Sequence, residues 1–201
     1  MEKKITIIDY GLGNIASVIN MIKKVGGIAE VCDCPSKLVD VQKLILPGVG
    51  SFDQGMRNLI NDGWVEPLTY LVKEKKTPIL GICLGMQLMA RKSAEGESKG
   101  LCWIDADVKQ FDIDLKVPHM GWNSVVVNKE NVFFSLESEN RFYFVHSYFF
   151  VCDHKDDILL TTNYGIDFTS AFQVGNVIGM QFHPEKSHKF GMSVFKSFLD
   201  M

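Results

Sequence analysis

The first ninety residues alternate short apolar runs with stretches whose apolar residues recur every three or four positions. Four of the runs predict strands, at 4–8, 28–32, 43–46 and 78–82. Between the first two, residues 15–25 have helical spacing and are followed by two glycines, which are typical of a helix end. Strands that alternate with helices in this way predict a parallel sheet covered on both faces.

The second half of the chain is richer in strand-forming residues. Apolar and β-branched runs predict strands at 123–127, 141–151, 158–163, 170–174 and 177–182. Gly175-Asn176 separates the last two runs and is typical of a hairpin turn, so antiparallel strands are expected to extend the sheet. A final helix is expected at 190–199. The predicted fold is a three-layer α/β sandwich with a central, largely parallel sheet extended by antiparallel strands.

Composition limits the classes of function. With 201 residues, 46% of them apolar, the chain fits a single domain, 1–201, without repeats or linkers. A net charge of -3 without a run of Lys or Arg argues against nucleic acid or an anionic membrane as partner. Residues 1–4 lead directly into a strand without a signal-peptide core, so we expect a cytoplasmic protein. Five scattered cysteines without a Cys-x-x-Cys pair indicate reduced thiols, and we expect neither metal nor cofactor.

One cysteine stands at a glycine-flanked turn, Gly81-Ile82-Cys83-Leu84-Gly85, directly after the apolar run. The two glycines let a strand and a helix approach closely, and the turn projects the central side chain, as in a nucleophile elbow. The pattern at 86–90 predicts that a helix follows, whose N-terminus would favour the thiolate of Cys83. A buried core cysteine is the alternative, but both glycines favour a catalytic nucleophile.

A cysteine nucleophile requires a base, and His183-Pro184-Glu185 offers one beside a carboxylate. Because proline disfavours a helix for the residue before it, His183 is expected to be extended, with Glu185 on the same side. Glu185 would then orient one imidazole nitrogen while the other accepts the Cys83 proton and donates it to the leaving amine. The alternative is a turn at a strand end with a solvated glutamate.

Acyl transfer also requires donors for an oxyanion. The backbone N–H of Leu84, which follows the nucleophile, is the first expected donor. A second is expected from Val49 or Gly50, because the glycine-rich loop 47–51 follows a strand and permits unusual peptide orientations. An ordinary glycine-rich turn is the alternative for this loop. The polar segment 95–100 is expected to be only a surface loop.

Three segments resemble the class I, triad-type glutamine amidotransferases: Gly-Ile-Cys-Leu-Gly-Met-Gln at 81–87, Pro-Gly-Val-Gly at 47–50 and Gln-Phe-His-Pro-Glu-Lys-Ser at 181–187. In that family the cysteine attacks the side-chain amide of L-glutamine, forms a glutamyl thioester and releases ammonia. The resemblance implies a triad of Cys83, His183 and Glu185. It also implies that the substrate glutamine is bound by Gln87, Ser147 and Tyr148.

Further segments at 9–14, 118–123 and 143–148 are similar to the glutaminase subunits of imidazole glycerol phosphate synthase. This resemblance implies a heterodimer with a barrel-shaped cyclase subunit, which receives the ammonia in histidine biosynthesis. It places three residues toward that partner: Asn14, Trp122 and Lys186. We further expect that the free subunit is nearly idle and that the partner completes the oxyanion hole.

Other interpretations remain open. Gly11-Leu12-Gly13-Asn14-Ile15-Ala16, with Asp33 further on, formally matches a dinucleotide-binding fingerprint, but an oxidoreductase would leave the elbow unexplained. A free-standing cysteine hydrolase would keep the same fold and nucleophile. Paralogous glutaminases that supply ammonia for nucleotide-sugar modification in surface-polysaccharide pathways look similar at 164–168 and 188–191. His119 and His146 lack metal-ligand spacing and are expected to pack in the core or at an interface.

Overall fold

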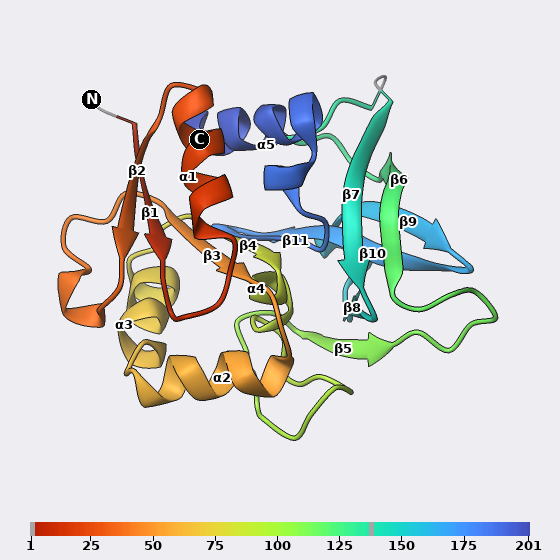
Figure 1. Cartoon of the computed structure of the whole chain (residues 1–201), viewed down its shortest axis with the longest axis horizontal. Coiled ribbons are helices and arrows are strands. Elements are labelled where there is room, and N and C mark those ends of the chain that lie inside the picture. The colour runs from red at the N-terminus through yellow and green to blue at the C-terminus, as the bar shows by residue number, and fades with distance from the viewer. Residues whose placement is uncertain (1–2, 137–138) are drawn as a thin grey trace.

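A mixed β-sheet forms the centre of the molecule and carries helices on both faces (Figure 1). The computed structural model describes residues 3–136 and 139–201. In this part of the chain the main strand order is β2-β1-β3-β4-β11-β10-β9-β6-β7, and β5 and β8 pair with each other beside β10. The expected three-layer α/β sandwich is confirmed. The expectation that residues 1–4 lead directly into a strand rests partly on residues 1 and 2, which lie outside the described residues.

The parallel half of the sheet contains the four strands predicted from the first ninety residues. Each pairs in parallel with its neighbour, and β11 pairs in parallel with β4. The bounds are β1 (Lys4–Ile8), β2 (Ile28–Cys32), β3 (Leu44–Gly48), β4 (Ile79–Cys83) and β11 (Val177–Met180). The first two agree with the predicted ranges, while β3 and β4 extend to Gly48 and Cys83. The carboxyl ends of β3 and β4 therefore lie side by side, with Gly48 opposite Cys83.

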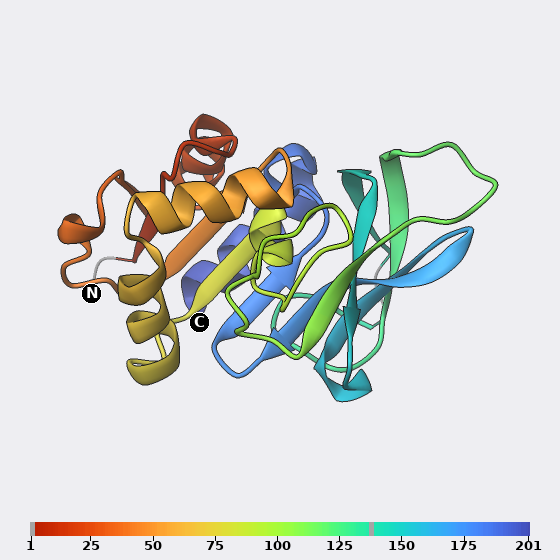
Figure 2. The same ribbon diagram turned by 90° about the horizontal axis from the view of Figure 1, so that it is seen from below.

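Helices cover the two faces of the parallel half separately (Figures 1 and 2). On one face lie α1 (Ile15–Lys24) and α5 (His188–Asp200), which pack against each other. On the other lie α2 (Phe52–Asn61), α3 (Val65–Thr69) and a π-helical turn, Tyr70–Glu74. Because side chains alternate along a strand, Ile7 joins the core beneath α1 and α5, while its neighbour Ile8 joins the core beneath α2.

The antiparallel half differs from the prediction in several elements: Ala106–Gln110 is a strand that was not predicted, and the strands predicted at 123–127 and 170–174 begin four residues earlier. The run predicted as a single strand at 141–151 is two strands, which separate at Ser147 because β7 pairs with β6 while β8 pairs with β5 and β10. The strands are β5 (Ala106–Gln110), β6 (His119–Val127), β7 (Asn140–His146), β8 (Tyr148–Cys152), β9 (Ile158–Tyr164) and β10 (Ile166–Val174). The predicted hairpin at Gly175 is confirmed: its φ is +56° and Val174 pairs with Val177.

The helix after Cys83 is shorter than predicted. The pattern at 86–90 predicted helix throughout, but α4 is a single turn, Leu84–Gln87. Carbonyl groups that a longer helix would use accept hydrogen bonds from a later segment instead, since Leu101 N donates to Leu88 O and Cys102 N donates to Ala90 O. A four-residue helix aligns few peptide dipoles, so the dipole supports a thiolate less than a long helix would.

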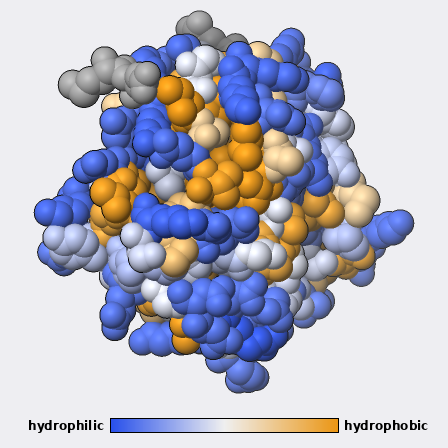
Figure 3. All heavy atoms as spheres, turned by 60° about the vertical axis from the view of Figure 1, so that its left-hand side comes forward, coloured by the Kyte–Doolittle hydropathy of each residue, from blue (hydrophilic) through white to orange (hydrophobic). Residues whose placement is uncertain are grey.

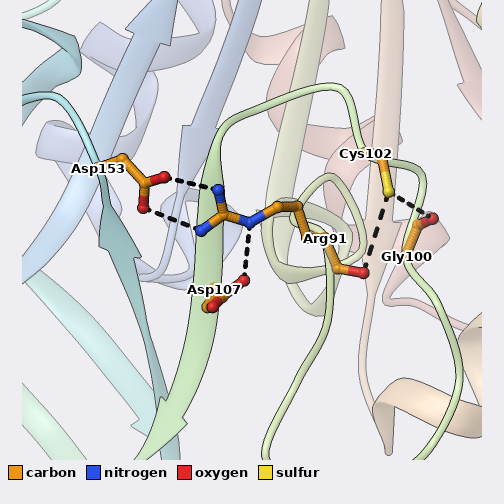
Figure 4. A network of polar contacts seen from close by, with 5 residues as sticks. All are labelled: Arg91, Gly100, Cys102, Asp107 and Asp153. Carbon is orange, nitrogen blue, oxygen red and sulfur yellow. Dashed lines mark hydrogen bonds and ion pairs between the residues drawn. The ribbon is translucent and has the colours of Figure 1, made fainter.

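An ion-pair network anchors the segment that follows α4 (Figure 4). The Arg91 guanidinium lies between two carboxylates: Nε is 2.9 Å from Asp107 Oδ1, and the terminal nitrogens contact both oxygens of Asp153. These bonds raise the pKa of Arg91. They tie the start of the loop 91–102 to β5 and to the residue after β8, and this loop reaches the candidate site described below.

The sheet ends at β2, an edge strand with exposed Ile28 and Val31. Figure 3 turns this side forward and shows apolar side chains gathered above the centre of the view. Among the described residues, no helix is both long and apolar enough to cross a membrane.

Candidate active site

Cys83 stands at a strained corner between β4 and α4. Its φ is +52°, a conformation that residues with a β-carbon rarely adopt, and the residue is 8% exposed. Both flanking positions require glycine for steric reasons. A β-carbon on Gly85 would lie 1.8 Å from Leu46 O, and one on Gly81 would lie 2.7 Å from Met89 Cε. The structure thus places the thiol on a tight strand-to-helix turn, as predicted from the two glycines.

His183 and Glu185 form a buried pair beside this turn. Nδ1 of His183 is 2.8 Å from Oε1 of Glu185, and the two side chains are 1% and 2% exposed. Burial lowers the pKa of His183, but interactions with Cys83 and Glu185 outweigh it and raise the pKa to about 10. Nε2 has no hydrogen bond of normal geometry to the described residues. This ring nitrogen is therefore available to exchange a proton with the thiol.

The local backbone differs from the predicted extended segment. His183 itself is extended, with φ -101° and ψ 93°, but Pro184–Lys186 forms a 3-10 turn because Lys186 N donates to His183 O at 3.0 Å. Glu185 therefore reaches the imidazole from a turn rather than from a strand. Ser187, which sequence reasoning missed, fixes this turn by donating to His183 O at 2.7 Å and accepting from Tyr143 N at 3.0 Å.

A cavity of about 340 Å³ opens in front of the cysteine. Eight of the residues expected for catalysis, oxyanion binding or substrate binding line it: Val49, Gly50, Cys83, Leu84, Gln87, Ser147, Tyr148 and His183. Glu185 lies behind His183 as its hydrogen-bond partner. The structure thus brings segments from four distant parts of the sequence to one pocket.

The expected oxyanion donors lie at the wall of this cavity. Gly50 has φ +114°, which glycine adopts readily, and Val49 is 40% exposed. Gly48 lies beneath them, where a β-carbon would be 2.6 Å from the Tyr10 hydroxyl. The loop 48–50 thus has a fixed base at the end of β3 and an exposed tip. Donation by Val49, Gly50 or Leu84 to an oxyanion stays a prediction.

Two glutamine side chains lie beside the thiol, and of these Gln87 lines the cavity. Gln87 Nε2 donates to Tyr148 O at 3.1 Å and to Gln181 Oε1 at 3.0 Å, and Gln181 Nε2 donates to Cys83 Sγ at 3.7 Å. Both hydrogens of the Gln87 amide are thereby used, which leaves Oε1 as its group for a ligand. Sequence reasoning noted Gln181 only as part of a motif and missed its contact with the nucleophile.

The expectation for segment 95–100 is wrong at Glu95. This side chain lines the cavity, and its Oε2 accepts a hydrogen bond from Phe52 N at 2.7 Å, at the start of α2. A carboxylate favours the N-terminus of a helix, where backbone N–H groups lack partners. No local pattern indicated this position, because the loop 91–102 is brought to the site by its long-range contacts.

The residues expected to face a partner lie outside the cavity. Trp122 on β6 is 45% exposed and stacks on the ring of His188, with centroids 5.7 Å apart and an interplanar angle of 3°. Lys186 places its ammonium group 5.9 Å from the centre of the Tyr143 ring. Asn14 directly precedes α1. Their role at an interface stays a prediction.

The glycine loop that formally matches a dinucleotide fingerprint is packed against the protein. A β-carbon on Gly13 would lie 3.1 Å from Pro47, and one on Gly11 would lie 3.3 Å from the Asn58 side chain. These glycines permit close approach between the end of β1 and its neighbours. Among residues 3–136 and 139–201, no group of three or more His, Cys, Asp or Glu side chains is arranged to hold a metal ion.

The family model described as glutamine amidotransferase class-I matches residues 6–201. The chain belongs to this family. Among its relatives is the imidazole glycerol phosphate synthase subunit HisH 2 of Pseudomonas aeruginosa, 52% identical over 98% of this chain and 99% of the relative. The protein of the same name from Methanococcus maripaludis is 50% identical over 97% of this chain and 98% of its own. The resemblance found in the sequence is thereby confirmed, and the chain is a glutamine amidotransferase.

Solved structures agree at the level of fold. PurLQS from Thermotoga maritima superposes with a TM-score of 0.78 at 18% identity, over 100% of this chain and 99% of that chain. A crystal structure of a glutamine amidotransferase also gives a TM-score of 0.78 at 18% identity, over 98% and 97% of the two chains. At such low identity the similarity concerns the arrangement of the sheet and helices.

Proposed function

We propose that this chain is the glutaminase subunit of an imidazole glycerol phosphate synthase, which hydrolyses L-glutamine and passes ammonia to a cyclase subunit in histidine biosynthesis. The observation that carries the glutaminase chemistry is the meeting of Cys83 and His183 at one cavity, with Glu185 hydrogen-bonded to His183 behind it. The names of the Pseudomonas and Methanococcus relatives support the choice of synthase.

In the proposed reaction, His183 accepts the proton of Cys83 at Nε2, and the thiolate sulfur attacks the side-chain carbonyl carbon of glutamine. Glu185 holds Nδ1–H and stabilises the imidazolium that forms. The tetrahedral intermediate carries a negative oxygen, which the N–H groups of Leu84 and of Val49 or Gly50 stabilise. Its collapse transfers the imidazolium proton to the leaving nitrogen and releases ammonia. Water then hydrolyses the thioester to glutamate with the same base.

The cavity has groups suited to the two ends of glutamine. The Glu95 carboxylate, which lines the wall, can pair with the α-ammonium of an amino acid. Gln87 Oε1 can accept a hydrogen bond from an amide, and Ser147 and Tyr148 complete the same wall. These positions favour an amino-acid amide over a peptide or ester, and a substrate screen separates the proposal from a free-standing cysteine hydrolase.

The partner is proposed to be a barrel-shaped cyclase that forms a heterodimer with this chain. Asn14, Trp122 and Lys186 are the proposed contacts. Ammonia has to pass between the subunits unprotonated, because ammonium is a poor nucleophile. We further propose that the free subunit has almost no glutaminase activity and that the partner completes the oxyanion hole at Val49 or Gly50.

The proposed unit is a single domain, 1–201, without metal or cofactor. It would act in the cytoplasm, where its free cysteines would stay reduced.

The test is co-purification of the native partner, followed by steady-state assays of glutamate release and of product formation. Glutaminase activity that rises strongly on adding the cyclase would support the proposal, and equal activity with and without it would contradict it.

Cys83→Ala should abolish glutamine-dependent synthesis while leaving ammonia-dependent synthesis intact, because only the nitrogen supply is removed. Equal loss of both activities would show that Cys83 is structural.

The surface around Trp122 supports a second candidate for the synthase that receives the ammonia. His188, Lys189 and Phe190 form a pocket there with Trp122 and Arg141, and this segment is similar to paralogous glutaminases that serve nucleotide-sugar modification. In that case the same glutaminase chemistry would feed a different synthase. Growth of a histidine-requiring strain restored by this chain with its native partner would favour the histidine pathway, and restored surface polysaccharide would favour the other.

A further inference from the structure

Two buried histidines outside the triad form a directed pair. His119 on β6 and His146 at the end of β7 are 3% and 6% exposed, and His119 Nδ1 lies 2.9 Å from His146 Nε2. His146 Nδ1 lies 2.8 Å from Tyr148 O. Burial lowers the pKa of His119 to about 4 and that of His146 to about 3, so both rings are neutral near pH 7. Their packing inside the protein confirms the expectation from the sequence.

The bonds determine where the protons lie. A carbonyl oxygen only accepts, so His146 carries its single proton on Nδ1 and donates it to Tyr148 O. His146 Nε2 is then an acceptor, which places the proton of His119 on Nδ1. His119 Nε2 in turn accepts from Asn123 Nδ2 at 3.2 Å. Both rings therefore have the same tautomer, and each donor points toward Tyr148.

The chain of hydrogen bonds continues to the nucleophile. Tyr148 O also accepts from Gln87 Nε2, whose second hydrogen goes to Gln181 Oε1, and Gln181 Nε2 donates to Cys83 Sγ. The Tyr148 carbonyl is thus shared between His146 and Gln87. A shift of this carbonyl would break its hydrogen bond with the Gln87 amide. Gln87 would then no longer hold Gln181 in its orientation.

We propose that His119 and His146 are positioning residues of the glutaminase centre, which hold the Tyr148 carbonyl so that Gln87 and Gln181 aim an amide N–H at the Cys83 sulfur. This inference rests on the proposed function of Cys83. The N–H of Gln181 supports negative charge on the sulfur before attack and holds the thiol on the cavity side. His119 does not line the cavity, and His146 lines it with both ring nitrogens already engaged, to His119 and to Tyr148 O.

Packing alone does not account for imidazoles at these positions. His119 stacks on Phe144 and Tyr164 with ring centroids 4.8 and 4.0 Å apart, and His146 packs against Phe111 and Phe168. A phenylalanine could fill such sites without burying polar nitrogens, which costs free energy unless every nitrogen is hydrogen-bonded. What the imidazoles add is a donor with a fixed direction.

Two substitutions of His119 separate positioning from packing. His119→Phe keeps an aromatic ring but removes the donor, whereas His119→Asn keeps an N–H near the place of Nδ1 and removes the ring. We expect His119→Phe to lower kcat for glutamine about tenfold, the equivalent of one lost hydrogen bond, with little change in KM, and His119→Asn to retain most of kcat. Ammonia-dependent synthesis should be unchanged in both. The reverse order, with Phe active and Asn impaired, would overturn the proposal.

A measurement on the unmodified protein keeps the inference testable even if a variant fails to fold. Imidazole 15N chemical shifts of the full chain should show both histidines as the neutral Nδ1–H tautomer between pH 5 and pH 8. An Nε2–H tautomer for either ring, or titration near pH 6.5, would overturn the proposal. If Cys83 proved not to be the nucleophile while these tautomers were observed, the proposed function would fail but the hydrogen-bonded chain would stand.

Discussion

Gly85 lies against the end of β3 so closely that a β-carbon on it would be 1.8 Å from the Leu46 carbonyl oxygen. The obstacle is backbone in the centre of the sheet, which cannot rotate away as a side chain would. Gly85→Ala should therefore displace α4 from β3 and lower the free energy of unfolding by about 3 kcal/mol, with loss of glutaminase activity. Chemical denaturation of the variant and the wild type measures this difference.

Gly63→Ala is the matched control for this substitution. Gly63 has φ +74° but open space where a β-carbon would go, so alanine there bears only the backbone strain, about 1 kcal/mol. If Gly85→Ala lowered the free energy of unfolding by no more than Gly63→Ala does, the close approach of Gly85 to Leu46 would not account for the effect.

Local patterns predicted the catalytic elements because the residues that form them are neighbours in sequence. Gly81 and Gly85 indicated the turn at Cys83, and Pro184 together with Glu185 indicated an oriented His183. The strands 4–8 and 28–32 were predicted with the observed bounds, although only the first is buried and the second is the exposed edge of the sheet.

The remaining parts of the site depend on contacts between distant segments. Gln181 meets Cys83 only because β11 pairs with β4, and Glu95 reaches the cavity because Arg91 anchors its loop to β5. The change of strand partner at Ser147 has no signal in the apolar run on either side of it. Such features need the register of the sheet, which a single sequence does not provide.

Glu185→Gln should slow glutamine hydrolysis at least about a hundredfold, because an amide in place of the carboxylate no longer stabilises the imidazolium of His183. The carboxylate is one of the groups that raise the pKa of His183, so this pKa should also fall. Steady-state kinetics with the native partner measures the rate, and ammonia-dependent synthesis by the same complex is the internal control. A wild-type rate would remove Glu185 from the triad.

Glu95→Gln should raise KM for glutamine about tenfold or more with a smaller effect on kcat, because it removes the charge proposed to bind the α-ammonium. The amide oxygen can still accept the hydrogen bond from Phe52 N, so the loop should keep its place. Glu97→Gln, an exposed change of the same kind in the same loop, is the control. Equal KM values for the two variants would contradict a substrate role for Glu95.

The histidine pair should make the protein sensitive to acid. Their pKa values in the folded state lie below the unfolded value of about 6.5, so the unfolded chain binds more protons at pH 5. The stabilisation is complete above pH 6.5 and is lost as pH falls toward 4 and 3, by about 2 kcal/mol for each histidine at pH 5. Urea unfolding at pH 7 and pH 5 measures this, and His119→Phe should lose less stability between the two pH values than the wild type. A loss unchanged by that substitution would contradict the assignment.

The central claim is that the Cys83 sulfur attacks the side-chain carbon of glutamine. The most direct measurement is mass spectrometry of the complex with its native partner after treatment with an electrophilic glutamine analogue. We predict a single modification on the peptide that contains Cys83, prevented by excess L-glutamine and slowed in Glu185→Gln. An unlabelled Cys83, or labelling of the exposed Cys102 at an equal rate, would contradict the account.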